Sequence, residues 1–155
     1  FLGVEEHLER LDLGPEEDGV LRGAAKTAGL DIVRLATPTT DDERLKTVLD
    51  GAGGFLYYVS IAGVTGTKTF AEENVRDAVA RIRRSSDLPC AVGFGIRTPE
   101  QAAGIARFAD AAVVGSSIVS NIADSAAQGK EKVALVEQAL NFCNLLAKAI
   151  RVARV

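Results

Sequence analysis

The chain has 155 residues, a single-domain length that can bury a substantial core. Its composition is ordinary for a globular protein, with 47% hydrophobic and 25% charged residues, and its formal charge of −3 comes from 18 basic and 21 acidic residues spread along the chain. These values exclude a basic face for nucleic acid. No apolar run approaches the roughly 20 residues of a membrane span, so we expect a cytoplasmic protein without membrane contact.

The N-terminal part of the sequence predicts little regular structure before a first helix. Residues 1–11 mix leucines with charged residues and favour a weak amphipathic helix or an irregular stretch. Pro15 suits the first position of a helix, and the acidic residues at 16–18 favour the positive end of the helix dipole. We therefore predict a helix from Pro15 that Gly29 closes.

A strand, a helix and a second strand are expected next. Residues 31–37, DIVRLAT, have the character of a strand. Thr40 followed by Glu43 is the pattern of a capping box and predicts the start of the helix that follows. Residues 55–60 form an apolar run that we expect to be a strand buried on both faces, as parallel strands are.

The same alternation continues to the end of the sequence. Helices are expected at 72–86, 98–108, 116–126 and 132–151, and strands at 90–93 and 111–115. Thr98, Pro99 and Gln101 combine a cap, a first-turn proline and a capping-box side chain, and Ser116 or Ser117 is expected to cap the next helix. Four strands alternating with helices predict an α/β domain with a parallel sheet.

Small residues follow two of the predicted strands. Gly93 and Gly95 stand at the end of one strand, and Gly115 and Ser116 lead from the next strand directly into a helix. Glycine lets the backbone approach a phosphate, a helix N-terminus presents unpaired N–H donors, and a serine hydroxyl adds another. A phosphate-binding site is one interpretation, and tight turns that use glycine for steric reasons alone are the other.

Other kinds of site have little support in the sequence. Cys90 and Cys143 are far apart in the chain and are expected to be buried free thiols in a reducing compartment. No cluster of His, Cys or carboxylates has the spacing of metal ligands, so no metal is expected. Ser60, Ser116 and Ser117 lack an identifiable base, which argues against hydrolase chemistry.

Three stretches in order carry a resemblance to a known family: 54–66 (GFLYYVSIAGVTG), 93–102 (GFGIRTPEQA) and 113–119 (VVGSSIV). Over about residues 12–129 the chain resembles the α subunit of tryptophan synthase, a (β/α)8-barrel lyase, beginning roughly halfway along the family's chain. The resemblance implies a TIM-barrel fold represented by about four βα units, half to two-thirds of a barrel. Residues 1–155 would form one partial-barrel domain with an irregular stretch at 1–11.

The resemblance also implies an activity and a set of substrate contacts. The family belongs to tryptophan biosynthesis and cleaves indole-3-glycerol phosphate to indole and glyceraldehyde 3-phosphate by a retro-aldol reaction. By the motif match, Gly66, Gly95, Gly115 and Ser116 correspond to positions that hold the substrate phosphate. Phe94 would lie against the indole or glycerol portion of the substrate.

Supporting roles follow from the first of the three stretches. Tyr57 matches a tyrosine that lines the family's active site, although a buried core tyrosine is the alternative, and Tyr58 on the opposite face is expected to be packing. The loop at 62–67 resembles a mobile lid in which Thr65 completes the site on closure; an ordinary surface loop is the alternative. Many members carry an arginine where this chain has Ile61, so an arginine gate is not expected here.

The acid and base of the reaction are not assigned in this sequence. Two carboxylates serve in the family, a glutamate at the end of its second strand and an aspartate on the following loop, and we expect both upstream of residue 1. Asp12 is expected to be a cap or loop residue, and His7 to be exposed. The resemblance implies a β-subunit partner that uses pyridoxal phosphate, with no cofactor in this chain itself.

Two other functions stay open at this point. One is another phosphate-binding TIM-barrel enzyme, such as a sugar-phosphate isomerase or a thiamine-phosphate synthase relative. The other is a non-catalytic half-barrel that binds phosphate or a partner protein. Four parallel strands without the rest of a barrel expose two sheet edges and apolar helix faces, so self-association or poor solubility is expected.

Overall fold

The computed structural model describes residues 14–15, 18–60, 68–93 and 95–154, though not the side chains of 68–71. It contains a four-stranded sheet in the order β1-β2-β3-β4, and each neighbouring pair is parallel. The strands are β1 (Arg34–Ala36), β2 (Leu56–Val59), β3 (Cys90–Gly93) and β4 (Ala111–Val113). Helices connect the consecutive strands, which confirms the expected α/β architecture.

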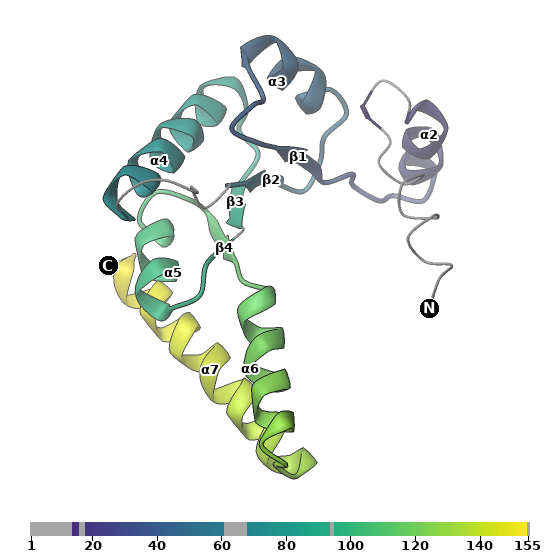
Figure 1. The fold of residues 1–155 in the computed structure, drawn as a ribbon. Helices are drawn as coiled ribbons and strands as arrows, with labels where there is room; N and C mark the ends of the chain where they lie inside the picture. Colours follow the sequence, from purple (N-terminus) through teal and green to yellow (C-terminus); the bar gives the residue numbers. More distant parts are fainter. Residues whose placement is uncertain (1–13, 16–17, 61–67, 94, 155) are drawn as a thin grey trace.

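Six described helices accompany the sheet: α2 (Gly19–Thr27), α3 (Asp42–Leu49), α4 (Lys68–Ser85), α5 (Pro99–Ala106), α6 (Ser116–Ala127) and α7 (Lys132–Ala153). Figure 1 shows the elements arranged as an open arc, with α3, α4 and α5 along its outer side. Helix α2 lies at one end of the arc, and α6 and α7 form a helical hairpin at the other. The arc is the shape expected of consecutive βα units that form part of a barrel.

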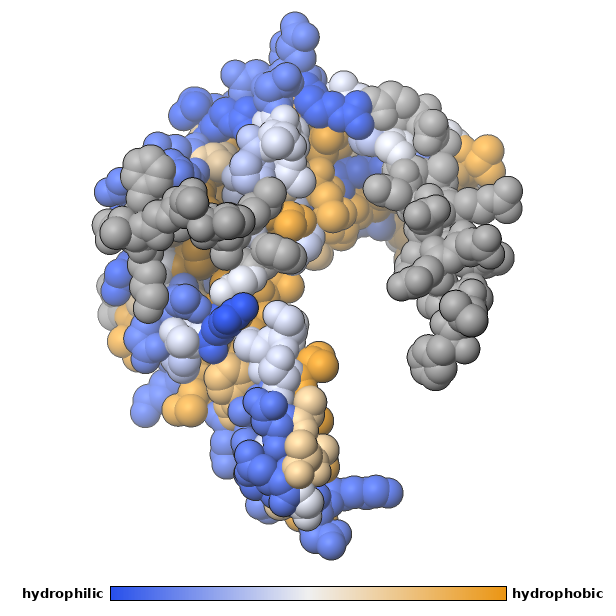
Figure 2. Space-filling model, in the orientation of Figure 1, coloured by the Kyte–Doolittle hydropathy of each residue, from blue (hydrophilic) through white to orange (hydrophobic). Residues whose placement is uncertain are grey.

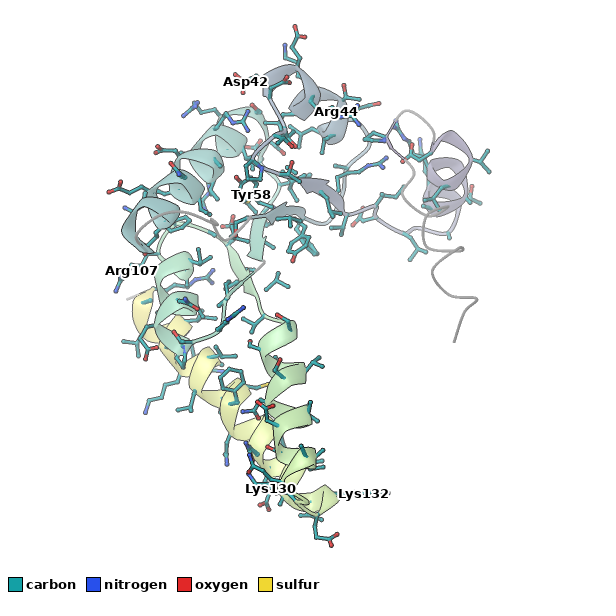
Figure 3. All side chains as sticks on the ribbon, viewed as in Figure 1. Asp42, Arg44, Tyr58, Arg107, Lys130 and Lys132 are labelled. Atoms are coloured by element: carbon teal, nitrogen blue, oxygen red, sulfur yellow. The ribbon has the colours of Figure 1, made fainter. Side chains whose placement is uncertain are left out.

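The main hydrophobic core lies between the outer face of the sheet and helices α3 and α4. Alternate strand residues point to this face, and Tyr58 of β2 is among them, only 3% exposed. In Figure 3 its side chain lies on the side of the sheet that α3 and α4 cover. The other buried members are Ala36, Leu45, Val48, Leu56, Val79, Ile82, Cys90, Val92 and Ala109. Tyr58 is therefore a packing residue, as predicted.

The opposite, inner face of the sheet is less covered. In register across the strands it presents Leu35, Tyr57, Ala91 and Ala111, and two residues further on Val59, Gly93 and Val113. Leu35 is 56% exposed and Val113 is 38% exposed. Figure 2 shows hydrophobic surface along the inner side of the arc. In a closed barrel this face lines the interior, where layers of side chains pack against one another.

A second, smaller core joins the α6–α7 hairpin to the sheet. Ile96, Ala102 and Leu146 are buried together, with Ile105 and Phe142 packed against them. The hairpin is thus anchored mainly through α7, which packs along α5. The end of the loop after β3 is held in this core by Ile96.

The first described helix begins later than the sequence predicted. Pro15 lies in a turn and Asp18 is the N-cap of α2, so the expectation of a helix starting at Pro15 was wrong. The carboxylate of Asp18 makes no capping hydrogen bond. It pairs with the guanidinium of Arg34 on β1, where both side chains are buried. Gly29 ends this segment with a φ of 67°, as expected of a residue after a helix.

The start of α3 differs from the prediction by one residue. Asp41, not Thr40, is the N-cap, and its side chain accepts a hydrogen bond from the Arg44 N–H at 2.7 Å. The Thr40 hydroxyl instead accepts from the backbone N–H of Thr37 at 3.0 Å. The predicted capping box of Thr40 and Glu43 was wrong because the turn before the helix already uses the threonine hydroxyl.

The predicted boundaries hold better around β3 and α5. The capping box of Thr98 and Gln101 is present with proline at the start of the helix, which confirms that prediction. The first and last strands are shorter than expected, and α5 ends at Ala106 instead of Phe108. The last helix is longer than expected and runs to Ala153.

Helix α7 also changes one expectation drawn from composition. It has 22 residues and is long and apolar enough to cross a membrane, by length and composition only. Only 6% of its most apolar 18-residue stretch is buried. The sequence had indicated no such segment. Helix α7 packs against α5 and α6 through residues such as Phe142 and Leu146, so it is also a packing helix of this fold.

Candidate functional site

The candidate site lies at the carboxyl-terminal edge of the sheet, where β2, β3 and β4 end side by side. Because the strands are parallel, the residues that follow them meet at one edge. Ser60 joins the ends of β2 and β3: its backbone N–H and its hydroxyl both donate to the Gly93 carbonyl, each at 2.9 Å. Ser60 is 7% exposed. These two buried hydrogen bonds fix the two strand ends against each other.

Tyr57 lies across Gly93 on the inner face of the sheet. A Cβ atom built at Gly93 would stand 2.3 Å from the Tyr57 hydroxyl oxygen and 2.7 Å from its Cε2 atom. Such distances are shorter than real Cβ contacts, so the tyrosine ring occupies the space that the glycine leaves. The ring therefore faces the interior of the arc near the strand ends, which agrees with the predicted placement of Tyr57 on the opposite face from Tyr58.

The loop after β3 is held at its far end. Gly95 has a φ of 81°, a conformation that glycine adopts readily and other residues rarely do. Ile96 is buried, 6% exposed, and the backbone N–H groups of Arg97 and Thr98 donate to the Gln101 side-chain oxygen at 2.7 and 3.2 Å. The turn at Gly95 is thus set between a fixed strand and a capped helix.

The loop after β4 leads directly into α6. Gly115 is the N-cap, without a side-chain cap, so the expectation that Ser116 or Ser117 caps the helix was wrong. The Ser117 hydroxyl instead donates to the Ile96 carbonyl at 3.1 Å. The Ser116 side chain is exposed, and no hydrogen bond of its hydroxyl occurs in the described part of the chain.

These contacts bring together three of the five residues predicted to bind substrate. Gly95, Gly115 and Ser116 lie on two loops joined by the bond between Ser117 and Ile96. The first turn of a helix presents N–H groups without intrahelical partners and the positive end of its dipole. This geometry suits an anion such as a phosphate group.

The remaining predicted site residues lie outside the described residues. Gly66 and Phe94 are among them, and so is Thr65 of the predicted lid; Ile61, Asp12 and His7 are also outside. Sequence reasoning considered Ser60 only as a nucleophile and missed its hydrogen bonds to Gly93, and it missed the hydrogen bond of Ser117 to Ile96. The pairing of Gly93 with Tyr57 could have been sought in the strand pattern, because a glycine inside a strand often marks a close approach.

The opposite edge of the sheet carries titratable groups of another kind. Burial, and secondarily the charge of Asp110, raises the pKa of the Cys90 thiol to about 11. Burial alone would raise the pKa of Asp110, but the Cys90 N–H and the Arg83 guanidinium hold it below the ordinary value. Asp110 accepts from the Cys90 N–H at 2.8 Å and from Arg83 at 3.0 Å. This network fixes the amino ends of β3 and β4 and serves stability.

Neither cysteine of the chain is in a disulfide: Cys90 is buried and Cys143 is partly buried. No group of three His, Cys, Asp or Glu that could hold a metal ion occurs among the residues described by the structure. The expectations of no metal and no cofactor stay predictions. The described strand residues of the inner face also include no carboxylate.

The fold and the candidate site define a class of protein: part of a (β/α) barrel with small-residue loops at the carboxyl ends of two neighbouring strands, β3 and β4. A family model described as "Tryptophan synthase alpha chain" matches residues 8–151. The chain therefore belongs to the tryptophan synthase alpha chain family, a family of tryptophan biosynthesis.

Solved structures of the family agree with this assignment. Tryptophan synthase subunit alpha from Legionella pneumophila is 31% identical, with a TM-score of 0.77 over 91% of this chain and 50% of that chain. Tryptophan synthase from M. tuberculosis in an aminoacrylate-bound form is 28% identical, with a TM-score of 0.72 over 90% of this chain and 48% of that chain. The subunit alpha from Campylobacter jejuni is 29% identical, with a TM-score of 0.73 over 85% and 51%. The chain thus spans about half the length of these relatives.

Proposed function

We propose that this chain contributes the phosphate-binding part of a tryptophan synthase alpha barrel, which cleaves indole-3-glycerol phosphate to indole and glyceraldehyde 3-phosphate. The observation that carries the proposal is the hydrogen bond from the Ser117 hydroxyl to the Ile96 carbonyl. It joins the loop of Gly95 to the start of α6, so that both loops face one edge of the sheet.

The proposed phosphate site combines backbone and side-chain donors. Gly95 and Gly115 let the main chain approach the anion, and the Ser116 hydroxyl has no other hydrogen-bond partner in the described residues. The positive end of α6 attracts the phosphate charge. Gly66 would add a backbone donor, and Phe94 would pack on the apolar part of the substrate.

The reaction itself divides between this chain and groups outside it. The bond between indole C3 and the adjacent glycerol carbon breaks, indole C3 gains a proton, and the hydroxyl on that carbon loses a proton as it becomes the aldehyde. The two carboxylates that move these protons are expected upstream of residue 1. Tyr57 faces the interior next to Gly93, where it would line the substrate pocket, and Thr65 would complete the site on closure.

A β subunit that uses pyridoxal phosphate is the proposed partner of the complete protein. The proposal rests on family membership. A direct test is co-sedimentation of the purified chain with a bacterial β subunit, compared with the β subunit alone.

A second function is favoured by one observation. The described strand residues of the inner face are Leu35, Tyr57, Val59, Ala91, Gly93, Ala111 and Val113, none of which is an acid. A module that binds phosphate or a partner protein without chemistry needs no acid there. Another phosphate-binding barrel enzyme is less well supported, because the family model covers residues 8–151.

Phosphate binding is tested by titrating the labelled chain with glycerol 3-phosphate and following the backbone amide resonances. We expect the Gly95, Ser116 and Ser117 amides to shift, and Gly95→Val to abolish the response because valine rarely adopts a φ of 81°. Gly129→Val is the matched control, since Gly129 has a φ of 73° with no atom near its Cβ position and lies outside the site. Equal affinity in the Gly95 variant would remove phosphate from the proposal.

Catalysis is tested by indole release from indole-3-glycerol phosphate, with and without a β subunit. If the chain binds phosphate but releases no indole, the result supports a site whose acid and base lie outside residues 1–155. Release by the chain alone would assign the acid and base chemistry to residues 1–155, with Asp12 and Tyr57 as the first residues to substitute.

A further inference from the structure

The loop that follows β3 has two anchors on its far side, and both involve Ile96. The Ile96 side chain is buried in the small core with Ala102 and Leu146. Its carbonyl oxygen accepts the Ser117 hydroxyl at 3.1 Å, a contact between residues 21 positions apart in the sequence. The first contact fixes the depth of the loop, and because Val114 of the β4 loop packs on the same core, it also holds the two loops together by apolar packing. The second contact is the hydrogen bond that fixes the backbone of the loop relative to α6.

The backbone on either side of Gly95 is held by contacts to its own strand end or its own helix. Gly93 is fixed on the strand side by the two hydrogen bonds from Ser60. On the helix side, the Arg97 and Thr98 amides are held by Gln101. None of these contacts reaches across to the β4 loop, so in the described residues the Ser117 hydroxyl bond is the side-chain hydrogen bond that joins the two loops.

We propose that Ser117 is a positioning residue of the phosphate site: its hydroxyl sets the distance between the Gly95 turn and the first turn of α6. This inference rests on the phosphate site proposed above and gives a role to a residue that does not itself contact the phosphate. A phosphate that contacts both loops binds well only when both sets of donors point to the same place, because donors fixed in advance cost no reorganisation on binding.

Adjacent serines thus have separate roles. Ser116 is exposed, and its hydroxyl has no partner among the described residues, so it can face a ligand. Ser117 is half-buried, and its hydroxyl is already engaged by Ile96. Loss of the Ser116 hydroxyl would remove one donor, whereas loss of the Ser117 hydroxyl would misplace several.

The test compares Ser117→Ala with Ser117→Thr, which keeps the hydroxyl, and with the exposed Ser120→Ala on the same helix as the matched control. Two quantities are measured in each: the dissociation constant for glycerol 3-phosphate, and the amide order parameters of Gly95, Ile96 and Arg97 without ligand. We expect Ser117→Ala to weaken binding by roughly three- to tenfold, the range of one hydrogen bond, and to lower the order parameters. Threonine should restore both, and Ser120→Ala should change neither.

The outcomes separate this inference from the proposed function. Absence of binding by the unsubstituted chain overturns the phosphate site and the role of Ser117 with it. Binding by the unsubstituted chain, with equal affinity and unchanged order parameters in Ser117→Ala, overturns the role of Ser117 alone. A fall in thermal stability of Ser117→Ala with unchanged affinity would also overturn it, because the serine would then be structural only.

Discussion

At the scale of single residues, Gly93 and Tyr57 make the sharpest steric prediction. The Cβ of an alanine at 93 would stand 2.3 Å from the Tyr57 hydroxyl oxygen and 2.8 Å from Cζ. Either the ring or the strand must shift, and because the clash is with the far end of a half-buried ring, we expect a cost at the lower end of the about 1–3 kcal/mol typical of overpacked cores. We expect Gly93→Ala to lower the free energy of unfolding by this amount, which is measured as a lower urea midpoint.

The control for this prediction is a double-mutant cycle. In a Tyr57→Ala background the ring is gone, so Gly93→Ala should cost much less than in the unsubstituted chain. Additive effects of the two substitutions would show that the ring does not limit the size of residue 93. The same pair bears on function, because the glycine leaves the space that the end of the tyrosine ring occupies at the candidate site.

At the scale of elements, α2 is joined to β1 by a buried ion pair. Helix α2 contains no buried residue, but its N-cap Asp18 is 1% exposed and pairs with Arg34, which is 7% exposed. Arg22 of α2 also pairs with Asp50 at the end of α3, at 2.8 Å. Charge pairs thus replace apolar packing in holding this helix.

The Asp18 pair predicts a pH dependence of stability. Burial alone would raise the pKa of Asp18, but the hydrogen bond and charge of Arg34, with the charge of Arg22, lower it below the ordinary value. A lowered folded-state pKa stabilises the fold above the unfolded pKa of about 4, and this contribution is lost as the pH falls below it. We expect the urea midpoint to fall between pH 5 and pH 3, and to fall less in Asp18→Asn. The exposed Asp124→Asn is the control and should follow the unsubstituted chain; a parallel fall in Asp18→Asn would contradict the role of the pair.

Some local sequence signals were sufficient to predict where an element begins, and others were not. Thr98, Pro99 and Gln101 interact within one turn, so the sequence predicted the start of α5 correctly. At α3 two adjacent residues could act as the cap, and the choice of Asp41 depended on the turn before it. Glycines and serines after the strands indicated the edge of the sheet where the site lies.

Other parts of the site could not be predicted from sequence. The Ser117 bond joins loops 21 residues apart, and the Tyr57 contact joins neighbouring strands, so both depend on strand order and register. The start of α2 depended on a partner for Asp18 that lies on another element. Tertiary contacts of this kind override local preferences at the ends of elements.

At the scale of the whole molecule, the described chain exposes surface that a complete barrel buries. The inner face shows Leu35 at 56% and Val113 at 38% exposure. Edge strands β1 and β4 have no neighbour beyond them in the described sheet. The solved relatives are about twice as long, which leaves room for the further βα units that close a (β/α)8 barrel.

We therefore expect the isolated chain to self-associate, because exposed apolar faces and open sheet edges favour contact between copies. Light scattering should give a mass above that of one chain and rising with concentration. Leu35→Lys should lower this mass, since the lysine places a charge on the inner face. Val20→Lys is the matched control: Val20 is 90% exposed on α2, so the change adds the same charge away from the sheet. A monodisperse monomer for the unsubstituted chain would contradict the prediction, and an equal effect of Val20→Lys would assign the association to net charge instead of the inner face.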